Sequence, residues 1–196
     1  MADEVTRNSF YRQAREARQE KEFNFAFFAA FAVKILMPSE INFCPRCGTP
    51  ITLENKFGKT RAVCPACGWI HFADPKVAAA VLIEQDGRVL LVRRSFDPFK
   101  GMWTLPAGFV DADEDPARAA ERECFEETRL TVRVRGVERI VWGREHLRGA
   151  DFVIVYVAEI LSGELIAGDD ADEVGWFEKS NLPPLAFRAT KIILGG

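Results

Sequence analysis

Three glutamates near the middle of the chain constrain its fold more than any other feature. Glu123, Glu126 and Glu127 are spaced i, i+3 and i+4, so in a helix of 3.6 residues per turn they share one face. Like charges at these spacings repel each other and destabilise the helix unless a cation neutralises them. Hard divalent cations such as Mg²⁺ take carboxylate and phosphate oxygens as ligands. The spacing therefore predicts a metal-dependent site for phosphate chemistry, rather than a solvated acidic surface.

The residues around these acids resemble a family signature. From Gly108 to Leu130 the chain reads G-x5-E-x7-R-E-C-x-E-E-x-R-L, which resembles the Nudix hydrolase signature G-x5-E-x7-R-E-U-x-E-E-x-G-U, where U is a bulky apolar residue. One position departs, because Arg129 stands where the signature has glycine. Glycine suits a left-handed helix end, and a side chain in that conformation costs roughly 1–2 kcal/mol. The departure affects the exit of the helix and none of the acids.

The resemblance implies metal-assisted hydrolysis of the pyrophosphate bond in a nucleoside diphosphate linked to another moiety, with release of AMP. Mg²⁺ or Mn²⁺ held by the three signature glutamates would activate the attacking water. By the family pattern, Arg122 orients a signature acid, Glu114 ties the loop to the helix, and the Gly108 carbonyl completes a metal shell. Several Nudix enzymes add an acid from a later loop. Here Asp170 is the first candidate and Glu173 the second, with an acidic surface loop as the alternative.

Aromatic and basic residues late in the chain are candidates for binding the rest of the substrate. Trp142, Phe187 and Trp103 are large enough to stack on adenine, although a core position explains each of them more readily. Arg144, His146 and Arg148 fall in a loop from which they could contact the phosphates or the distal half of the substrate; the alternative is that they are solvated. These positions do not identify the substrate.

Two CxxC pairs form a second constellation of metal-binding type. Sixteen residues separate the pairs, which are Cys44 with Cys47 and Cys64 with Cys67. Tetrahedral Zn²⁺ takes four such thiolates. Two disulfides are the alternative, but nothing in the sequence marks a secreted chain. We therefore predict a zinc ribbon at residues 39–73 whose folding depends on its metal.

Two further expectations concern the ribbon and the remaining cysteine. Residues 51–63 alternate apolar and polar side chains around Gly58, which predicts a short hairpin. The fifth cysteine, Cys124, occupies an apolar position of the signature and is predicted to lie in the core. A reactive thiol is the alternative.

Residues 74–196 are predicted to form an α/β body. Two β-rich runs, 77–84 and 88–95, flank Asp86-Gly87, which is a strong hairpin signal. Asp115 followed by Pro116 predicts the N-cap and first residue of a helix that ends near Thr128. Further elements are expected at 131–142 (strand), 151–161 (central strand) and 186–193 (helix). This layering agrees with the α/β/α sandwich that the Nudix resemblance implies.

Residues 1–38 are predicted to be an N-terminal extension, charged at first and then an apolar helix from Phe23 to Met37. The apolar part is about fifteen residues long, shorter than the roughly twenty of a membrane-spanning helix. We expect a helix docked on the body or on a partner subunit, or an extension upstream of a natural start at Met37. A weak membrane anchor is the remaining alternative.

Composition limits the classes of partner. The net charge of −3 gives no general attraction to nucleic acid or to an anionic membrane, so neither is expected as a partner. We expect a cytoplasmic enzyme whose substrate is a nucleotide sugar or dinucleotide, and leave a homodimer open.

A zinc ribbon ahead of a Nudix body resembles two subgroups. NADH pyrophosphatases, which also remove NAD caps from RNA, carry a Ser-Gln-Pro-Trp-Pro-Phe-Pro run that this chain lacks between Leu130 and Leu161. The segments 72–76 and 185–187 resemble instead the shorter ADP-ribose and FAD pyrophosphatases. An alternative from another class is a catalytically weak ligand sensor, or a ribbon that binds nucleic acid or a partner. The complete set of signature acids favours the enzyme.

Overall fold

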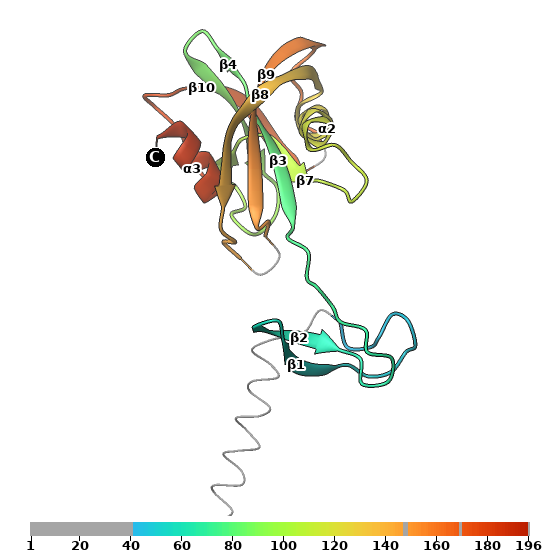
Figure 1. The fold of residues 1–196 in the computed structure, drawn as a ribbon. Coiled ribbons are helices and arrows are strands. Elements are labelled where there is room, and N and C mark those ends of the chain that lie inside the picture. The colour runs from blue at the N-terminus through green and yellow to red at the C-terminus, as the bar shows by residue number, and fades with distance from the viewer. Residues whose placement is uncertain (1–40, 147–148, 169, 196) are drawn as a thin grey trace, which may run out of the picture. The chain divides into compact units, whose positions relative to one another are not determined.

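The computed structural model describes residues 41–195, apart from 147–148 and 169 (Figure 1). The chain divides into two compact units, Met1–Ala73 and Asp74–Gly196, which are described separately. The extension predicted at residues 1–38 lies outside the described residues. Within the described part, no helix is long and apolar enough to cross a bilayer.

The first unit contains a two-stranded antiparallel sheet, as predicted around Gly58. Strand β1 (Thr52–Lys56) pairs with β2 (Lys59–Val63). Two residues, Phe57 and Gly58, connect the strands with φ of 55° and 73°, as in a type I′ turn, whose twist matches that of the strands. Asparagine, aspartate and glycine are the usual first residues of this turn. A phenylalanine in the left-handed region costs roughly 1–2 kcal/mol.

The four ribbon cysteines come together at the two knuckles. Each knuckle closes through a glycine N–H that donates to the first cysteine's carbonyl, at 2.9 Å for Gly48 and 3.0 Å for Gly68, and both glycines have positive φ. The cysteines are free of disulfides. Their sulfur atoms are 3.5–3.7 Å apart in the pairs Cys44–Cys67, Cys47–Cys64 and Cys47–Cys67. A tetrahedron with metal–sulfur bonds of about 2.3 Å has edges of about 3.8 Å, so the cluster fits Zn²⁺.

The second unit is built on two four-stranded sheets. The first has the order β7-β3-β9-β8, formed by Ala107–Phe109, Val77–Leu82, Phe152–Gly163 and Leu130–Trp142. Strand β9 runs parallel to β3 and antiparallel to β8, so the predicted central position of this strand is confirmed. The second sheet has the order β10-β5-β4, formed by Ala171–Glu178, Arg88–Arg94 and Glu84–Gln85, with β6 (Trp103–Thr104) also paired to β5.

Alternating side chains of β3 bury two separate core clusters, one on each face of the sheet. Ala79, Val81 and Ile83 pack with helix α2 (Pro116–Thr128), whereas Ala80 and Leu82 pack in the cluster that includes the last turn of helix α3 (Arg188–Leu194). Successive strand residues point to opposite faces, so one apolar run serves both layers. The α/β/α layering is confirmed, and Figure 1 shows the two helices on opposite sides of the strands.

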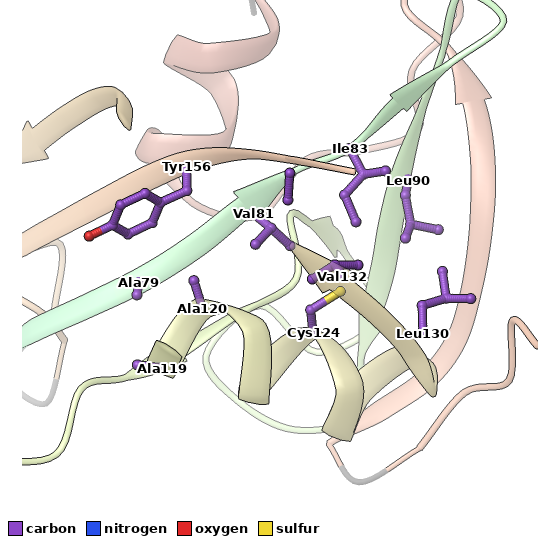
Figure 2. Packing of buried hydrophobic residues seen from close by; sticks show 11 residues of the cluster. Ala79, Val81, Ile83, Leu90, Ala119, Ala120, Cys124, Leu130, Val132 and Tyr156 are labelled. Carbon is purple, nitrogen blue, oxygen red and sulfur yellow. The ribbon is translucent and has the colours of Figure 1, made fainter. Parts of the chain in front are cut away.

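Helix α2 begins and ends where the sequence predicts. The Asp115 carboxylate accepts hydrogen bonds from the N–H groups of Ala117 (2.8 Å) and Arg118 (3.3 Å), which satisfies two donors at the helix start. Figure 2 shows Cys124 on the face of α2 that packs against Val81 and its neighbours. Burial leaves Cys124 fully inaccessible and raises its pKa to about 11, so the core interpretation is confirmed.

The structure corrects two strand predictions. The hairpin at Asp86-Gly87 joins β4 to β5 rather than the whole run at 77–84, because β3 pairs with β7 and β9 in the other sheet. The chain changes sheets at Ile83, which no turn residue marks. In addition, residues assigned to an acidic loop belong in part to β10, which pairs antiparallel with β5.

Arg129 takes the conformation of the glycine that it replaces. Its φ is 62°, and its N–H donates to the carbonyl of Phe125 at 2.8 Å. The guanidinium lies 5.7 Å from the centroid of the Phe125 ring, a contact of roughly 0.5–1 kcal/mol at an exposed site. The helix exit is therefore retained, and this contact offsets part of the cost of the left-handed backbone.

We expect Arg129→Gly to be more stable than Arg129→Ala by about 1 kcal/mol, because both lose the contact with Phe125 and only alanine keeps the strained Cβ. Urea unfolding of the full-length variants measures the difference. Equal stability would show that φ at this position is not strained.

We expect one zinc ion per chain, and we expect its removal, or Cys64→Ser, to unfold the ribbon while leaving the body folded. Zinc analysis combined with limited proteolysis measures both effects. Cys124→Ala, which changes the only cysteine outside the cluster, should keep its zinc. A ribbon that stays protease-resistant without zinc contradicts the assignment.

Candidate active site

A cleft of about 810 Å³ opens in the second unit beside the signature segment. Residues of β3, β5, β7, α2 and the segment around α3 line it. The acidic side chains of the lining are Asp97, Asp111, Glu123, Glu127, Glu145 and Asp170. The basic and aromatic side chains include Arg94, Phe96, His146, Phe187 and Arg188. The cleft thus places carboxylates next to groups that suit phosphate and a flat ring.

Arg122 is the hub of the ion pairs on α2. Its Nε and Nη2 donate to the two carboxylate oxygens of Glu114, both at 2.8 Å. Its Nη1 donates to Glu123 at 2.8 Å and to Glu126 at 3.1 Å, and Nη2 also reaches the carbonyl of Phe109 at 3.1 Å. The two parallel bonds to Glu114 are the geometry that guanidinium groups favour. These contacts lower the pKa of Glu114 and raise that of Arg122, so one cation holds three of the signature acids.

Glu127 differs from its neighbours because it is buried, with 8 % of its surface exposed. Burial raises its pKa to about 8, and the charges of Glu123 and Asp170 act in the same direction. The N–H of Ala107 donates to Glu127 Oε2 at 3.0 Å and, with Arg94, opposes the shift. A carboxylate in these surroundings requires either a proton or a nearby cation near neutral pH.

Gly108 allows the backbone of β7 to approach the helix closely. A Cβ atom at this position would lie 1.9 Å from Cδ of Glu123, so any side chain here would displace that carboxylate. Gly108 is paired with Ala79 in the sheet, so the backbone cannot shift without breaking the ladder. Glycine is therefore required here to seat the carboxylate of Glu123 against the strand.

The three helix glutamates share a face, but their oxygens do not converge. Arg122 attracts Glu123 and Glu126, whereas Glu127 turns to the N–H of Ala107. Among the described residues, only the four ribbon cysteines bring three or more metal-ligating side-chain atoms within 4.8 Å of one another. Helix periodicity determines the common face, and the arginine determines where two of the acids point.

The two later acids are placed differently from each other. Asp170 lines the cleft, and its backbone carbonyl accepts hydrogen bonds from the N–H (3.0 Å) and Oγ (2.7 Å) of Ser95. Glu173 instead pairs with Arg93 at 2.7 Å, with both side chains substantially exposed, and is not part of the cleft lining. The role of Glu173 as a site acid therefore stays a prediction, and the position of its side chain beside Arg93 does not support it.

Two of the substrate-binding candidates lie elsewhere. Trp142 is 73 % exposed at the end of β8 and does not line the cleft. Arg144 pairs with Asp151, its Nη2 and Nε donating at 2.8 and 3.0 Å. Asp151 also accepts the N–H of Lys76 at 2.9 Å. Arg144 therefore helps to fasten the loop after β8 to the start of β3, and its contact with the substrate stays a prediction.

The other two candidates, His146 and Phe187, do line the cleft, with ring centroids 6.4 Å apart. Phe187 also meets the ring of Phe99 edge-on at 5.2 Å. Trp103, the third aromatic candidate, is buried against Phe177 at 4.5 Å, as its core alternative states. Phe187 is thus the aromatic candidate that the fold brings to the cleft.

Sequence reasoning missed Arg94, which extends from the end of β5 into the cleft. Its guanidinium lies 4.8 Å from the ring centroid of Phe187 and 4.9 Å from that of Phe96, and its Nε donates to the carbonyl of Pro98 at 2.8 Å. Burial lowers its pKa below the usual range, while the charges of Glu127 and Asp170 oppose the shift. The signal in the sequence was the adjacent pair Arg93-Arg94 at the end of an apolar strand. Successive side chains of a strand point to opposite faces, so one of the two arginines must point inward.

Comparisons with known proteins agree with these observations. The chain matches the family model described as NUDIX domain over residues 74–194 and the one described as Nudix N-terminal over residues 42–73. A solved NUDIX hydrolase from Nitrosomonas europaea has 31 % identity and a TM-score of 0.71, covering 79 % of this chain and 88 % of that one.

Two curated relatives show the range of similarity. An ADP-ribose pyrophosphatase of Methanocaldococcus jannaschii is 41 % identical over 62 % of this chain and 73 % of its own length. An NAD-capped RNA hydrolase, NudC, of Chromobacterium violaceum is 30 % identical over 73 % of this chain. The match spans only about half (52 %) of that relative's length. Together, the family matches and the solved structure show that the chain belongs to the Nudix hydrolase family, with a zinc-ribbon unit ahead of its Nudix domain.

Proposed function

We propose that the protein is a divalent-metal-dependent pyrophosphohydrolase that cleaves a nucleoside diphosphate linked to another moiety, of the ADP-ribose class, and releases AMP. The observation that carries the proposal is the cleft in which the carboxylates of α2 stand beside Arg94 and Phe187. The similarity to a relative named ADP-ribose pyrophosphatase supports the substrate class.

The donor set of the cleft fits Mg²⁺ or Mn²⁺. All of its candidate ligands are hard oxygens: the carboxylates of Glu123 and Glu127 and the carbonyl of Gly108, whose residues line the cleft, and the carboxylate of Glu126, which is not part of the lining but shares their helix face. Such oxygens suit these ions. Glu127, whose raised pKa reflects burial without sufficient positive charge nearby, supports a cation at this position. When bound, the metal would supply a Lewis acid for the phosphate oxygens and lower the pKa of a bound water.

The chain's own residues would orient the ligands and the substrate. Arg122 and Glu114 would hold the loop before α2 against the helix, through the bidentate contact described above. Arg94, which faces the acids, would bind a substrate phosphate, since its Nε and both of its stacked rings already fix its plane. Phe187 would contact the nucleoside. Asp170 is the candidate for holding the attacking water, because it lines the same cleft as Glu127.

The decisive test of substrate class is hydrolysis of ADP-ribose, FAD, NADH, diadenosine tetraphosphate and NAD-capped RNA with Mg²⁺ or Mn²⁺, with the products separated by chromatography. AMP released from ADP-ribose or FAD, in a reaction that requires the metal, supports the proposal. Hydrolysis without added metal, or of none of these compounds, contradicts it.

We expect Glu126→Gln to lower kcat by about a hundredfold or more, since the lost charge weakens a metal contribution of several kcal/mol. The side chain of Glu126 is 38 % exposed, more than the other two glutamates paired with Arg122. The substitution should therefore leave the fold unaffected. Steady-state hydrolysis and thermal unfolding measure the two effects. Glu121→Gln, on the same helix but paired with Arg118 and Val134 N–H, is the matched control. Unchanged turnover in Glu126→Gln would contradict the assignment of this carboxylate as a metal ligand, whereas undetectable turnover in the wild type would favour a ligand-sensing role.

We expect Glu127→Gln to abolish hydrolysis and to change how stability depends on pH. The folded-state pKa of Glu127 is raised to about 8, so without added divalent cation its protonated form contributes stability below about pH 4. That contribution is lost as the pH rises through 8. The neutral glutamine avoids the loss. The melting temperature of Glu127→Gln should therefore rise relative to that of the wild type between pH 5 and about 9.

Thermal unfolding across this pH range, without and with Mg²⁺, measures the difference between Glu127→Gln and the wild type. Mg²⁺ should reduce the difference at high pH, because a cation replaces the proton on Glu127. A difference that is constant with pH contradicts the expected titration.

A further inference from the structure

We propose that the zinc ribbon carries a binding site for single-stranded nucleic acid at the tip of its hairpin. The site consists of Phe57, Phe72 and Arg61, which we call the aromatic tip. The rings of Phe57 and Phe72 are stacked, with centroids 6.2 Å apart and an interplanar angle of 26°. The guanidinium of Arg61 lies 4.5 Å from the centroid of Phe72. None of these residues lines the cleft, so the inference goes beyond the proposed function.

The aromatic tip is a stack of flat groups that faces solvent. Phe57 is 77 % exposed and Phe72 is 52 % exposed. Isolated exposed apolar residues are common and need no explanation. Here, however, the ring of Phe72 meets both the ring of Phe57 and the guanidinium of Arg61, although the three residues belong to the segment after the second knuckle, to the turn and to β2. Such a stack presents a π-face to an additional planar group.

The backbone at Phe57 indicates that this exposed ring is not there to stabilise the turn. Phe57 is the first residue of a type I′ turn, with φ of 55°. Asparagine, aspartate or glycine would satisfy that position with less strain. A bulky residue in this conformation that also exposes its ring contributes little to folding, and strained positions of this kind cluster at functional sites.

Charge favours an anionic strand as the occupant. Residues 41–73 carry four basic side chains and one acidic side chain, Glu54, although the whole chain has a net charge of −3. The basic residues are Arg46, Lys56, Lys59 and Arg61. Lys56 and Lys59 are directly paired across the strands next to the turn, and Glu54 lies 3.0 Å from Lys56. The net charge of the whole chain gives no general attraction to nucleic acid, but the hairpin tip has a local excess of positive charge.

Stacked rings beside cations match the chemistry of unpaired bases on a phosphate backbone. Aromatic side chains bind bases without regard to sequence, because every base has a π-face, and lysine and arginine contact the phosphates. Arg61 is suited to both roles, since its Nε already donates to the carbonyl of Lys56 at 3.2 Å and this fixes the plane of its guanidinium. A duplex keeps its bases stacked on each other, so it offers the tip only phosphates.

The test uses the full-length zinc-loaded protein without added Mg²⁺ or Mn²⁺. The probe is a 3′-labelled single-stranded RNA or DNA of about 12 nucleotides with a 5′-hydroxyl, so that it carries no diphosphate for the cleft. We expect fluorescence anisotropy to show binding at roughly 50 mM salt that weakens as salt increases. The matching duplex should bind at least about tenfold more weakly.

The decisive variant is Phe57→Asn, which supplies the residue that the turn prefers and removes the ring. It should bind the single strand about tenfold more weakly, while its zinc content and thermal stability stay the same or increase. Leu53→Ser, which removes an exposed apolar side chain from β1 of the same hairpin, should bind as the wild type does. Hydrolysis of ADP-ribose should be equal in all three proteins, so failure of this proposal is distinct from failure of the proposed function.

Several outcomes would overturn the inference. These are the absence of binding at low salt, equal binding of strand and duplex, and equal affinity of the wild type and Phe57→Asn. If the strand does not bind but the tip variant loses a protein partner in a pull-down, the surface is a protein interface and the nucleic-acid proposal is wrong.

Discussion

The ion pairs of Arg122 are the interaction on which the rest of the catalytic unit depends. One guanidinium contacts Glu114 in the loop before α2, Glu123 and Glu126 on the helix, and the carbonyl of Phe109 in β7. It therefore joins the loop, the helix and the strand through one side chain. It also offsets the mutual repulsion of acids that helix periodicity forces onto one face. A strongly acidic helix can fold here because its counter-charge is part of the same helix.

The core explains why this acidic face meets a cleft. Strand β3 shares its apolar residues between α2 on one side and the α3 layer on the other. The small residues Ala79 and Ala80 at its centre let both layers approach closely. Gly108, beside them in β7, lets Glu123 lie against the strand. The cleft thus results from small side chains at a crossing of strand and helix, and Arg94 and Phe187 line it from other elements.

The two units are stabilised by different physical means. The body buries two apolar clusters, whereas the ribbon buries few apolar side chains and relies on four cysteines held at tetrahedral separations. Folds of this size usually need a metal or another crosslink in addition to their apolar core. The exposed rings and local cations of the hairpin tip are consistent with a surface shaped by binding rather than by folding.

Local features could be predicted from the amino-acid sequence alone: the limits of α2, through Asp115-Pro116 and the signature; the ribbon hairpin at Gly58; the cysteine set; and the burial of Cys124. Each depends on contacts between residues close in the chain, or on a spacing that only one geometry satisfies. The tertiary structure decided what depends on long-range pairing. It placed β3 and β5 in different sheets, because an apolar run does not specify its partner strand. It turned Glu173 and Arg144 to local ion partners and left Trp142 exposed, because charge and ring type do not specify direction. It also brought Arg94 to Phe187, two residues 93 positions apart in the chain, through the packing of strand and helix layers that no local pattern encodes.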